Sequence, residues 1–298
     1  MTSRLLPFVC LIGMGCAWGL SMPMSKLAVS TGREHFGLIV WQIAIVALIM
    51  AVPLILRPRA ISVGLRHWRL LLVVALFGTI ISNSMSYLAA GQLPAGVMAI
   101  VMSLIPMSAL PIALFWGAEQ FNWRRLSGLV FGGIAMVVLI GPDTSLPNPA
   151  AAPFVLIAAI ATVCYGFEGN YVSRFGLGGL DAIQVLFYSS ILGLFIITPL
   201  ALVTGQFYNP LNGYGIAENA LIVSSVAHGT AYACYIWLVG RAGPVFAAQV
   251  SYVVTIAGIA LSMILLGERY SGFIWLALGL VLIGLFLVQP KSQDSEQA

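Results

Sequence analysis

Ten stretches of mostly apolar residues follow one another along this chain, separated by short polar segments. A helix needs about 20 apolar residues to cross the hydrocarbon core of a membrane, which is about 30 Å thick. The pattern therefore predicts ten membrane-spanning helices and short loops. The expected helices are Leu5 to Ala28, Phe36 to Leu56, Leu70 to Ala90, Pro94 to Trp116, Trp123 to Ile140, Ala152 to Tyr171, Ala182 to Thr204, Ile216 to Val239, Pro244 to Leu266 and Tyr270 to Val288.

The first stretch is interrupted by a segment rich in glycine and polar residues, which recurs half a chain later. Gly15 to Lys26 reads GCAWGLSMPMSK, and Val163 to Arg174 reads VCYGFEGNYVSR. Trp18 thus corresponds to Tyr165, 147 positions further on, and each is followed by glycine. This correspondence indicates an internal sequence repeat.

A second correspondence extends this repeat. Glu119 matches Glu268 at a separation of 149 residues, close to the separation of the first pair. We therefore expect two five-helix units, residues 1–145 and 146–298. Because five is an odd number, the second unit enters the membrane from the opposite side, which makes the repeat inverted. The predicted fold class is all-α integral membrane, with the architecture of secondary transporters, whose substrate site lies at the repeat interface near the midplane.

Composition agrees with a membrane protein. Hydrophobic residues make up 60% of the chain and charged residues 7%, against about 25% charged residues in a soluble domain. The net charge of +4 is spread over short loops, so no basic face for nucleic acid forms. The loops leave no room for a soluble catalytic domain. The sequence also lacks a phosphate-binding loop for ATP, so we expect no nucleotide cofactor.

Basic residues predict the orientation. Loops that carry most Lys and Arg stay in the cytoplasm. With a cytoplasmic N-terminus, ten basic residues lie inside and three outside, and both termini are cytoplasmic. The inner set is Arg4, Arg57, Arg59, Arg66, Arg69, Arg124, Arg125, Arg174, Arg241 and Lys291; the outer set is Lys26, Arg33 and Arg269.

Several motifs resemble one family. Trp18-Gly19 with Lys26, then Trp116-Gly117-Ala118-Glu119 before Gly128, Gly132 and Gly133, is similar to an EamA repeat of the drug/metabolite transporter superfamily, and Leu266-Gly267-Glu268 before Gly279 and Gly284 resembles a second one. This resemblance implies a ten-helix carrier in a bacterial inner membrane that exports amino acids or other small metabolites. Ala277 stands where the pattern of the first repeat has Gly128.

Glu168 is the acidic residue placed deep within a predicted span. An ionisable side chain in a membrane helix is a functional hypothesis by default. Glu168 could exchange a proton or pair with the ammonium group of a substrate. The alternatives are a structural partnership with His228, Lys26 or a backbone group, or a position near the inner surface.

His228 lies in a predicted span that also holds Tyr232. Protonation near neutral pH would allow a role in coupling, but a neutral histidine that hydrogen-bonds between helices is the favoured interpretation. No side chains stand at metal-ligand spacing, so we expect no metal.

Trp18 and Tyr165 are interpreted together because the repeat pairs them. Their helices run in opposite directions, which places Trp18 on the outer side of the midplane and Tyr165 on the inner side. We expect the two rings to flank a central cavity and to stack on a substrate. An interfacial or interhelical aromatic side chain is the alternative.

Polar side chains in two other spans extend the candidate cavity. Ser82 and Ser86 share one helix face, and Asn83 shares another with Tyr87; bonding between helices is equally compatible with them. Weaker candidates of the same kind in the ninth span are Gln249 and Tyr252.

Prolines mark two helices that the repeat pairs. Proline lacks an N–H and permits a kink. Kinks here would serve either as hinges or as static bends. The candidates are Pro94, Pro106 and Pro111 in the fourth span and Pro244 in the ninth.

The sequence as a whole predicts a secondary transporter that moves a small-molecule substrate by alternating access. Aromatic and hydroxyl side chains with one acid favour amino acids, including aromatic or apolar ones, as the substrate, and the family resemblance implies export. A multidrug exporter for lipophilic cations is the alternative, followed by an intramembrane enzyme. Energy coupling, direction and oligomeric state stay open.

Overall fold

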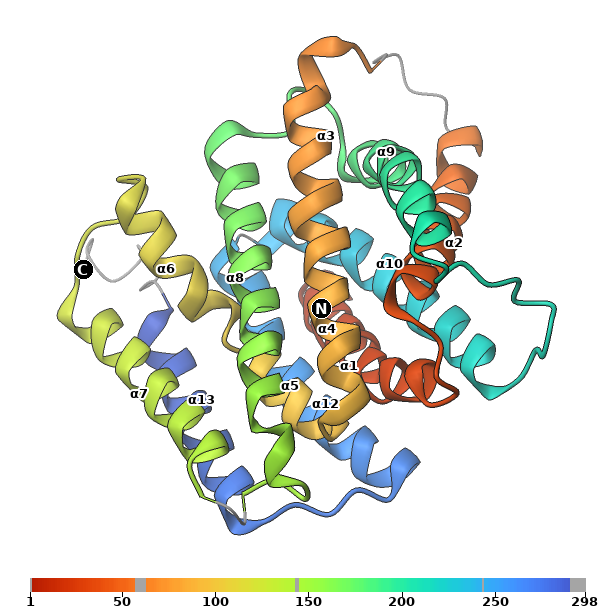
Figure 1. Ribbon diagram of the computed structural model, residues 1–298. Helices are drawn as coiled ribbons and strands as arrows, with labels where there is room; N and C mark the ends of the chain where they lie inside the picture. Colours follow the sequence, from red (N-terminus) through yellow and green to blue (C-terminus); the bar gives the residue numbers. More distant parts are fainter. Residues whose placement is uncertain (1, 57–62, 143–144, 243, 290–298) are drawn as a thin grey trace.

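A computed structural model describes residues 2–56, 63–142, 145–242 and 244–289 (Figure 1). Within these ranges every regular element is a helix. Eight helices or helix pairs in the described part are long and apolar enough to cross a membrane. Two further helices complete the ten, one of 17 apolar residues and one of 27 residues whose interior is more polar. Arg57, Arg59 and Lys291 lie outside the described residues.

The first half contains five spans, of which the third and fourth are each built from several elements. In chain order the elements are α1 (Thr2–Val29), α2 (His35–Leu56), η1 (Leu65–His67) with α3 (Trp68–Ala75), η2 (Leu76–Ile80) and α4 (Ile81–Gln92), then α5 (Ala95–Met102) with α6 (Ile105–Phe115), and α7 (Trp123–Ile140).

The second half repeats this order. Its elements are η3 (Pro149–Ala151) with α8 (Ala152–Phe175), α9 (Ala182–Val203), α10 (Ile216–Ala242), α11 (Pro244–Ala248) with α12 (Val250–Leu266), and α13 (Gly272–Val288). The ten observed spans follow the ten predicted ranges in order, with the ends of several helices displaced by a few residues.

Three spans are irregular inside the membrane. η2 is a π-helical turn within the third span. The fourth span breaks between α5 and α6 at Ser103 and Leu104, just before Pro106. The ninth span breaks at Gln249, between α11 and α12. The fourth and ninth spans are repeat counterparts, so the two breaks are related as well.

The contacts between helices are equivalent in the two halves: each helix packs on elements of the other half, and its counterpart packs on the corresponding elements of the first. α1 packs on α10 and α12, while its counterpart α8 packs on α4 and on α5 and α6. α2 packs on its own counterpart α9, and α7 on α13, on opposite sides of the view in Figure 1. This reciprocity is the geometry that an inverted repeat produces, and it confirms the predicted architecture.

The doubled glycine explains how the halves meet. A Cβ atom at Gly19 would lie 2.8 Å from the backbone nitrogen of Gly258 on α12, and one at Gly166 would lie 3.0 Å from that of Ala109 on α6. Only hydrogen fits at so close an approach. The repeated aromatic-glycine pair therefore marks the crossing of α1 on α12 and of α8 on α6.

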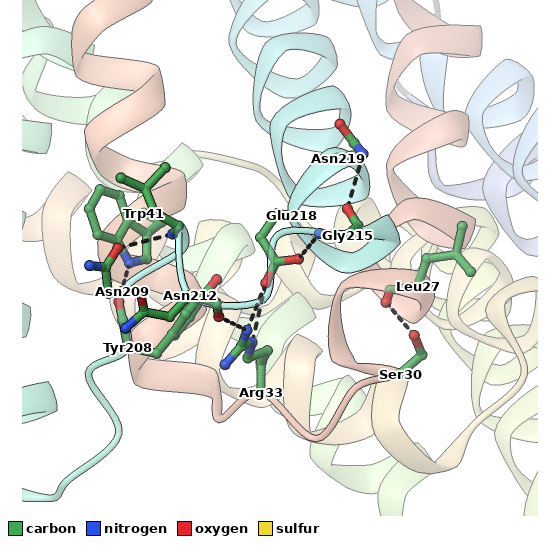
Figure 2. Close-up of polar contacts among 11 residues, drawn as sticks. Leu27, Ser30, Arg33, Trp41, Tyr208, Asn209, Asn212, Gly215, Glu218 and Asn219 are labelled. Atoms are coloured by element: carbon green, nitrogen blue, oxygen red, sulfur yellow. Dashed lines mark hydrogen bonds and ion pairs between the residues drawn. The ribbon is translucent and has the colours of Figure 1, made fainter.

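Polar contacts hold two loops together at the end of the bundle where α1 and α9 terminate (Figure 2). The Arg33 guanidinium lies 3.1 Å from the Glu218 carboxylate and donates to the carbonyl oxygen of Asn212. The Trp41 indole donates to the carbonyl oxygen of Tyr208, at 2.9 Å. Burial, together with Glu218, raises the pKa of Tyr208 to about 12, so the phenol is neutral at physiological pH.

Candidate substrate site

Glu168 lies on α8 with only 9% of its surface exposed. Its side chain faces Gly78 in the π-helical turn η2, where an added Cβ atom would lie 3.2 Å from Cγ of Glu168. π-Helical turns are frequent at functional sites. The missing side chain at Gly78 leaves the space that the carboxylate occupies, which sequence patterns alone did not indicate.

Phenol groups surround this carboxylate. Glu168 interacts with Tyr165 on its own helix and with Tyr232 and Tyr235 on α10. A buried charge needs polar neighbours because an isolated one is strongly unfavourable in a low dielectric. The structure thus places Glu168 in a buried position beside Tyr232, while Lys26 donates instead to the carbonyl oxygen of Gly91. A partnership of Glu168 with His228 stays a prediction.

Trp18 extends the cluster into the first half of the chain. Its ring centroid lies 5.7 Å from that of Tyr235 and 6.2 Å from that of His228, both on α10. Tyr235 also interacts with Glu168, so Trp18 on α1 and Glu168 on α8 both neighbour residues of α10. Residues from both repeats therefore meet in one polar and aromatic centre.

The polar stripe of α4 divides between two partners. Asn83 accepts a hydrogen bond from the Tyr165 hydroxyl, at 2.8 Å. Tyr87 instead donates to the Gln42 side chain on α2, at 2.9 Å. Ser82 is fully buried, and Ser86 donates to the carbonyl oxygen of Ser82 within the helix. Asn83 and Ser82 thus lie beside Tyr165, whereas Tyr87 joins α4 to α2.

The two candidates on the ninth span lie elsewhere. Gln249 is exposed at the break between α11 and α12. Tyr252 packs against a separate apolar cluster and interacts with Arg124 at the start of α7. The structure does not bring either residue into contact with the Glu168 cluster.

Three of the four candidate prolines lie at the start of a helix, and one lies inside a helix. Pro94 precedes α5, and Pro106 is the second residue of α6, directly after the break in the span. Pro111 lies inside α6, and Pro244 opens α11. The structure thus places a helix end or break at three of the four prolines, while bending during transport stays a prediction.

A carboxylate from the second half caps α5. Glu268 accepts hydrogen bonds from the backbone N–H groups of Ala95 and Gly96, at 2.8 and 3.1 Å, and from the Tyr270 hydroxyl, at 2.6 Å. A negative charge at this position is stabilised by the unpaired N–H groups and the helix dipole. Its repeat counterpart Glu119 instead pairs with Arg125, at 2.6 Å. The repeat is therefore asymmetric at this point.

A cavity of about 290 Å³ lies next to this cap. Its polar lining comes from four different connections or helix ends, namely Lys26, Gln92, Asn148, Glu268 and Arg269. The α7–α8 and α12–α13 connections that contribute to it run along the lower edge of Figure 1. All these segments belong to the predicted outer face, so the cavity is an indentation of that face.

An inverted repeat of ten spans around a buried polar centre is the architecture of a secondary transporter. The EamA-like transporter family model matches residues 6–141 and 152–289, one copy in each half. The chain belongs to the EamA-like transporter family. It is therefore a membrane transporter rather than an enzyme.

Individual relatives of low sequence identity agree with this family assignment. The "Uncharacterized inner membrane transporter YedA" of Escherichia coli is 27% identical over 238 residues, covering 74% of this chain and 71% of that protein. An "S-adenosylmethionine uptake transporter" of Rickettsia felis is 28% identical over 132 residues, covering 44% and 42%. One crystal structure aligns with a TM-score of 0.62 over 93% of this chain and 97% of the other at 17% identity, which shows the fold alone.

Proposed function

We propose that this transporter exports amino acids across a bacterial inner membrane by alternating access around the Glu168 cluster. The observation that carries the proposal is the Glu168 carboxylate, buried against Gly78 and surrounded by tyrosines. A buried acid of this kind attracts an ammonium group, and the neighbouring rings suit an apolar or aromatic side chain. The site residues belong to helices of both halves.

The relatives are compatible with this substrate class. The rickettsial relative is named for S-adenosylmethionine uptake, and that solute carries an α-amino acid group. It also carries a sulfonium cation, so it fits the second candidate, an exporter of lipophilic cations. Attraction between a cation, Glu168 and the aromatic rings favours that candidate as well. Export rather than uptake is our inference from the resemblance noted in the sequence.

The two breaks give the proposed movement a place to occur. Interrupted helices leave backbone groups free to rearrange within a protein interior. We propose that the fourth and ninth spans bend at Ser103–Leu104 and at Gln249, with the repeat units 1–145 and 146–298 as the two halves. Basic residues support an orientation with both termini in the cytoplasm, and the cavity beside Lys26 then opens outward.

Transport by purified protein in liposomes tests the substrate class. We expect uptake of radiolabelled amino acids, compared with lipophilic cations and measured with and without a pH gradient. Glu168→Gln removes the charge but keeps the size of the side chain, so transport should fall by at least about tenfold, the effect of losing a charged hydrogen-bond partner. Its thermal stability should change little.

Glu34→Gln is the matched control, because Glu34 is exposed between α1 and α2. Its transport should equal that of the wild type. Normal amino-acid transport by Glu168→Gln would rule out a role for this carboxylate. Transport of lipophilic cations but of no amino acid would select the second candidate.

A further inference from the structure

The Trp18 indole N–H is buried and has no hydrogen-bond acceptor. In the described part of the chain only the Tyr208 hydroxyl shares this condition. Buried polar groups are almost always paired, because an unpaired one has lost its water without replacement. An orphaned donor therefore needs an explanation.

The neighbours of Trp18 do not supply an acceptor. Its ring lies against His228 and Tyr235 and packs on an apolar cluster that includes Leu11 and Met14. The indole is a donor only, so its partner must be an oxygen or nitrogen atom with a free lone pair. The Tyr235 hydroxyl and the His228 ring carry such atoms, but neither forms a hydrogen bond with Trp18 Nε1. The rings around it make tilted aromatic contacts, whereas the N–H group of the side chain has no partner.

The repeat counterpart of Trp18 has a hydrogen-bond acceptor for its polar group. Tyr165 corresponds to Trp18 and donates its hydroxyl hydrogen to Asn83 on α4, at 2.8 Å. Both residues precede a glycine at an equivalent helix crossing. One copy of the motif is thus complete, and the other lacks its acceptor.

The missing acceptor and the buried acid belong to the same cluster. The Trp18 ring lies against Tyr235 on α10, with centroids 5.7 Å apart and the rings tilted by 51°, and Tyr232 and Tyr235 of the same helix interact with Glu168. A donor on α1 and a carboxylate on α8 therefore approach one centre from the two repeats. An unpaired donor and a carboxylate that both neighbour residues of α10 match a solute that carries an anionic and a cationic group.

We propose that Trp18 Nε1 donates a hydrogen bond to the carboxylate of the transported solute, while Glu168 holds its ammonium group. This inference rests on the proposed function and narrows its substrate class to zwitterionic α-amino acids. Trp18 is then a specificity residue that separates an amino acid from the amine with the same side chain. Its aromatic contact with Tyr235 would serve both solutes equally.

Binding to purified protein tests this division of roles. The probes are matched pairs, namely phenylalanine with phenethylamine and leucine with 3-methylbutylamine. Trp18→Phe keeps an aromatic ring and removes the N–H group. The affinity for the amino acid should fall about tenfold, as expected for a hydrogen bond to a charged group. The affinity for the amine should stay within about twofold, since it lacks the carboxylate.

Trp237→Phe on α10 is the control, because the Trp237 side chain is exposed at the surface of the bundle. It should bind both members of each pair as the wild type does. A second measurement needs no variant: wild-type protein should bind each amine at least about tenfold more weakly than its amino acid. That comparison stands even if Trp18→Phe does not fold.

The outcomes separate the two proposals. Equal losses for amino acid and amine in Trp18→Phe, or no loss for either, overturn the role of the indole and leave the proposed function intact. Wild-type protein that binds the amines as tightly as the amino acids also overturns it. Wild-type protein that binds no amino acid overturns both this inference and the proposed function.

Discussion

Single glycines set the distances between helices at the points where the two halves cross. Gly19 and Gly166 each bring two backbones together, and Gly78 makes room for the Glu168 carboxylate. Small residues at helix contacts are typical of membrane proteins, because association there depends on close packing. At the residue scale, the position of the site therefore depends on glycines, which let helices and side chains approach closely, as well as on the larger side chains of the site.

Gly19→Ala should separate α1 from α12. The added methyl group would lie 2.8 Å from the Gly258 nitrogen, a backbone atom that cannot turn aside. Overpacking of this kind costs about 1–3 kcal/mol, so the melting temperature in detergent should fall. Gly13→Ala on the same helix is the control, since no atom lies within 4 Å of its added methyl group. Equal melting temperatures for the two variants would contradict this account of the crossing.

Helix ends carry the clearest asymmetry at the scale of elements. α5 is buried along its whole length, and the Glu268 carboxylate caps its first N–H groups. The equivalent Glu119 pairs with an arginine side chain. The Glu268 cap therefore joins the two repeats, whereas the Glu119–Arg125 ion pair lies within the first repeat.

Glu268→Gln should destabilise the protein more than Glu119→Gln. The amide has only one oxygen for two N–H groups and no charge for the helix dipole, which costs about 1 kcal/mol. The Glu119 side chain is 38% exposed, and such ion pairs contribute about 0–1 kcal/mol. Melting curves of the two variants in one detergent provide the comparison. A larger loss in Glu119→Gln would show that the cap is not the stronger connection.

The sequence predicted the ten spans and the repeat because length, hydropathy and a doubled motif are properties of the chain itself. It also selected Glu168, since an acid within an apolar run stands out. It did not predict that Gly78 faces this acid or that Tyr87 bonds to Gln42, because these contacts depend on how separate helices rotate against each other. The partners of Glu268 are backbone N–H groups, which every residue except proline possesses, so no pattern indicated them.

The molecule as a whole is indented on one face. The cavity near Lys26 and Asn148 lies among the ends of α1, α4, α7 and α12, and these ends alternate along the chain with those of the opposite face. An even number of spans places both termini on the face opposite the cavity. With cytoplasmic termini, the proposed alternating access would make this cavity part of the solute's path on the outer side.

Labelling of single cysteines tests this orientation. In a background with Cys10, Cys16, Cys164 and Cys234 replaced by serine, Asn148→Cys reports on the cavity face and Gln120→Cys on the opposite face; both positions are exposed. With a membrane-impermeant maleimide, intact cells should label Asn148→Cys, and Gln120→Cys should react only after permeabilisation. This is expected because loops rich in Lys and Arg, such as the segment with Arg124 and Arg125, stay in the cytoplasm. The reverse pattern would show the opposite orientation, in which the cavity near Lys26 opens to the cytoplasm.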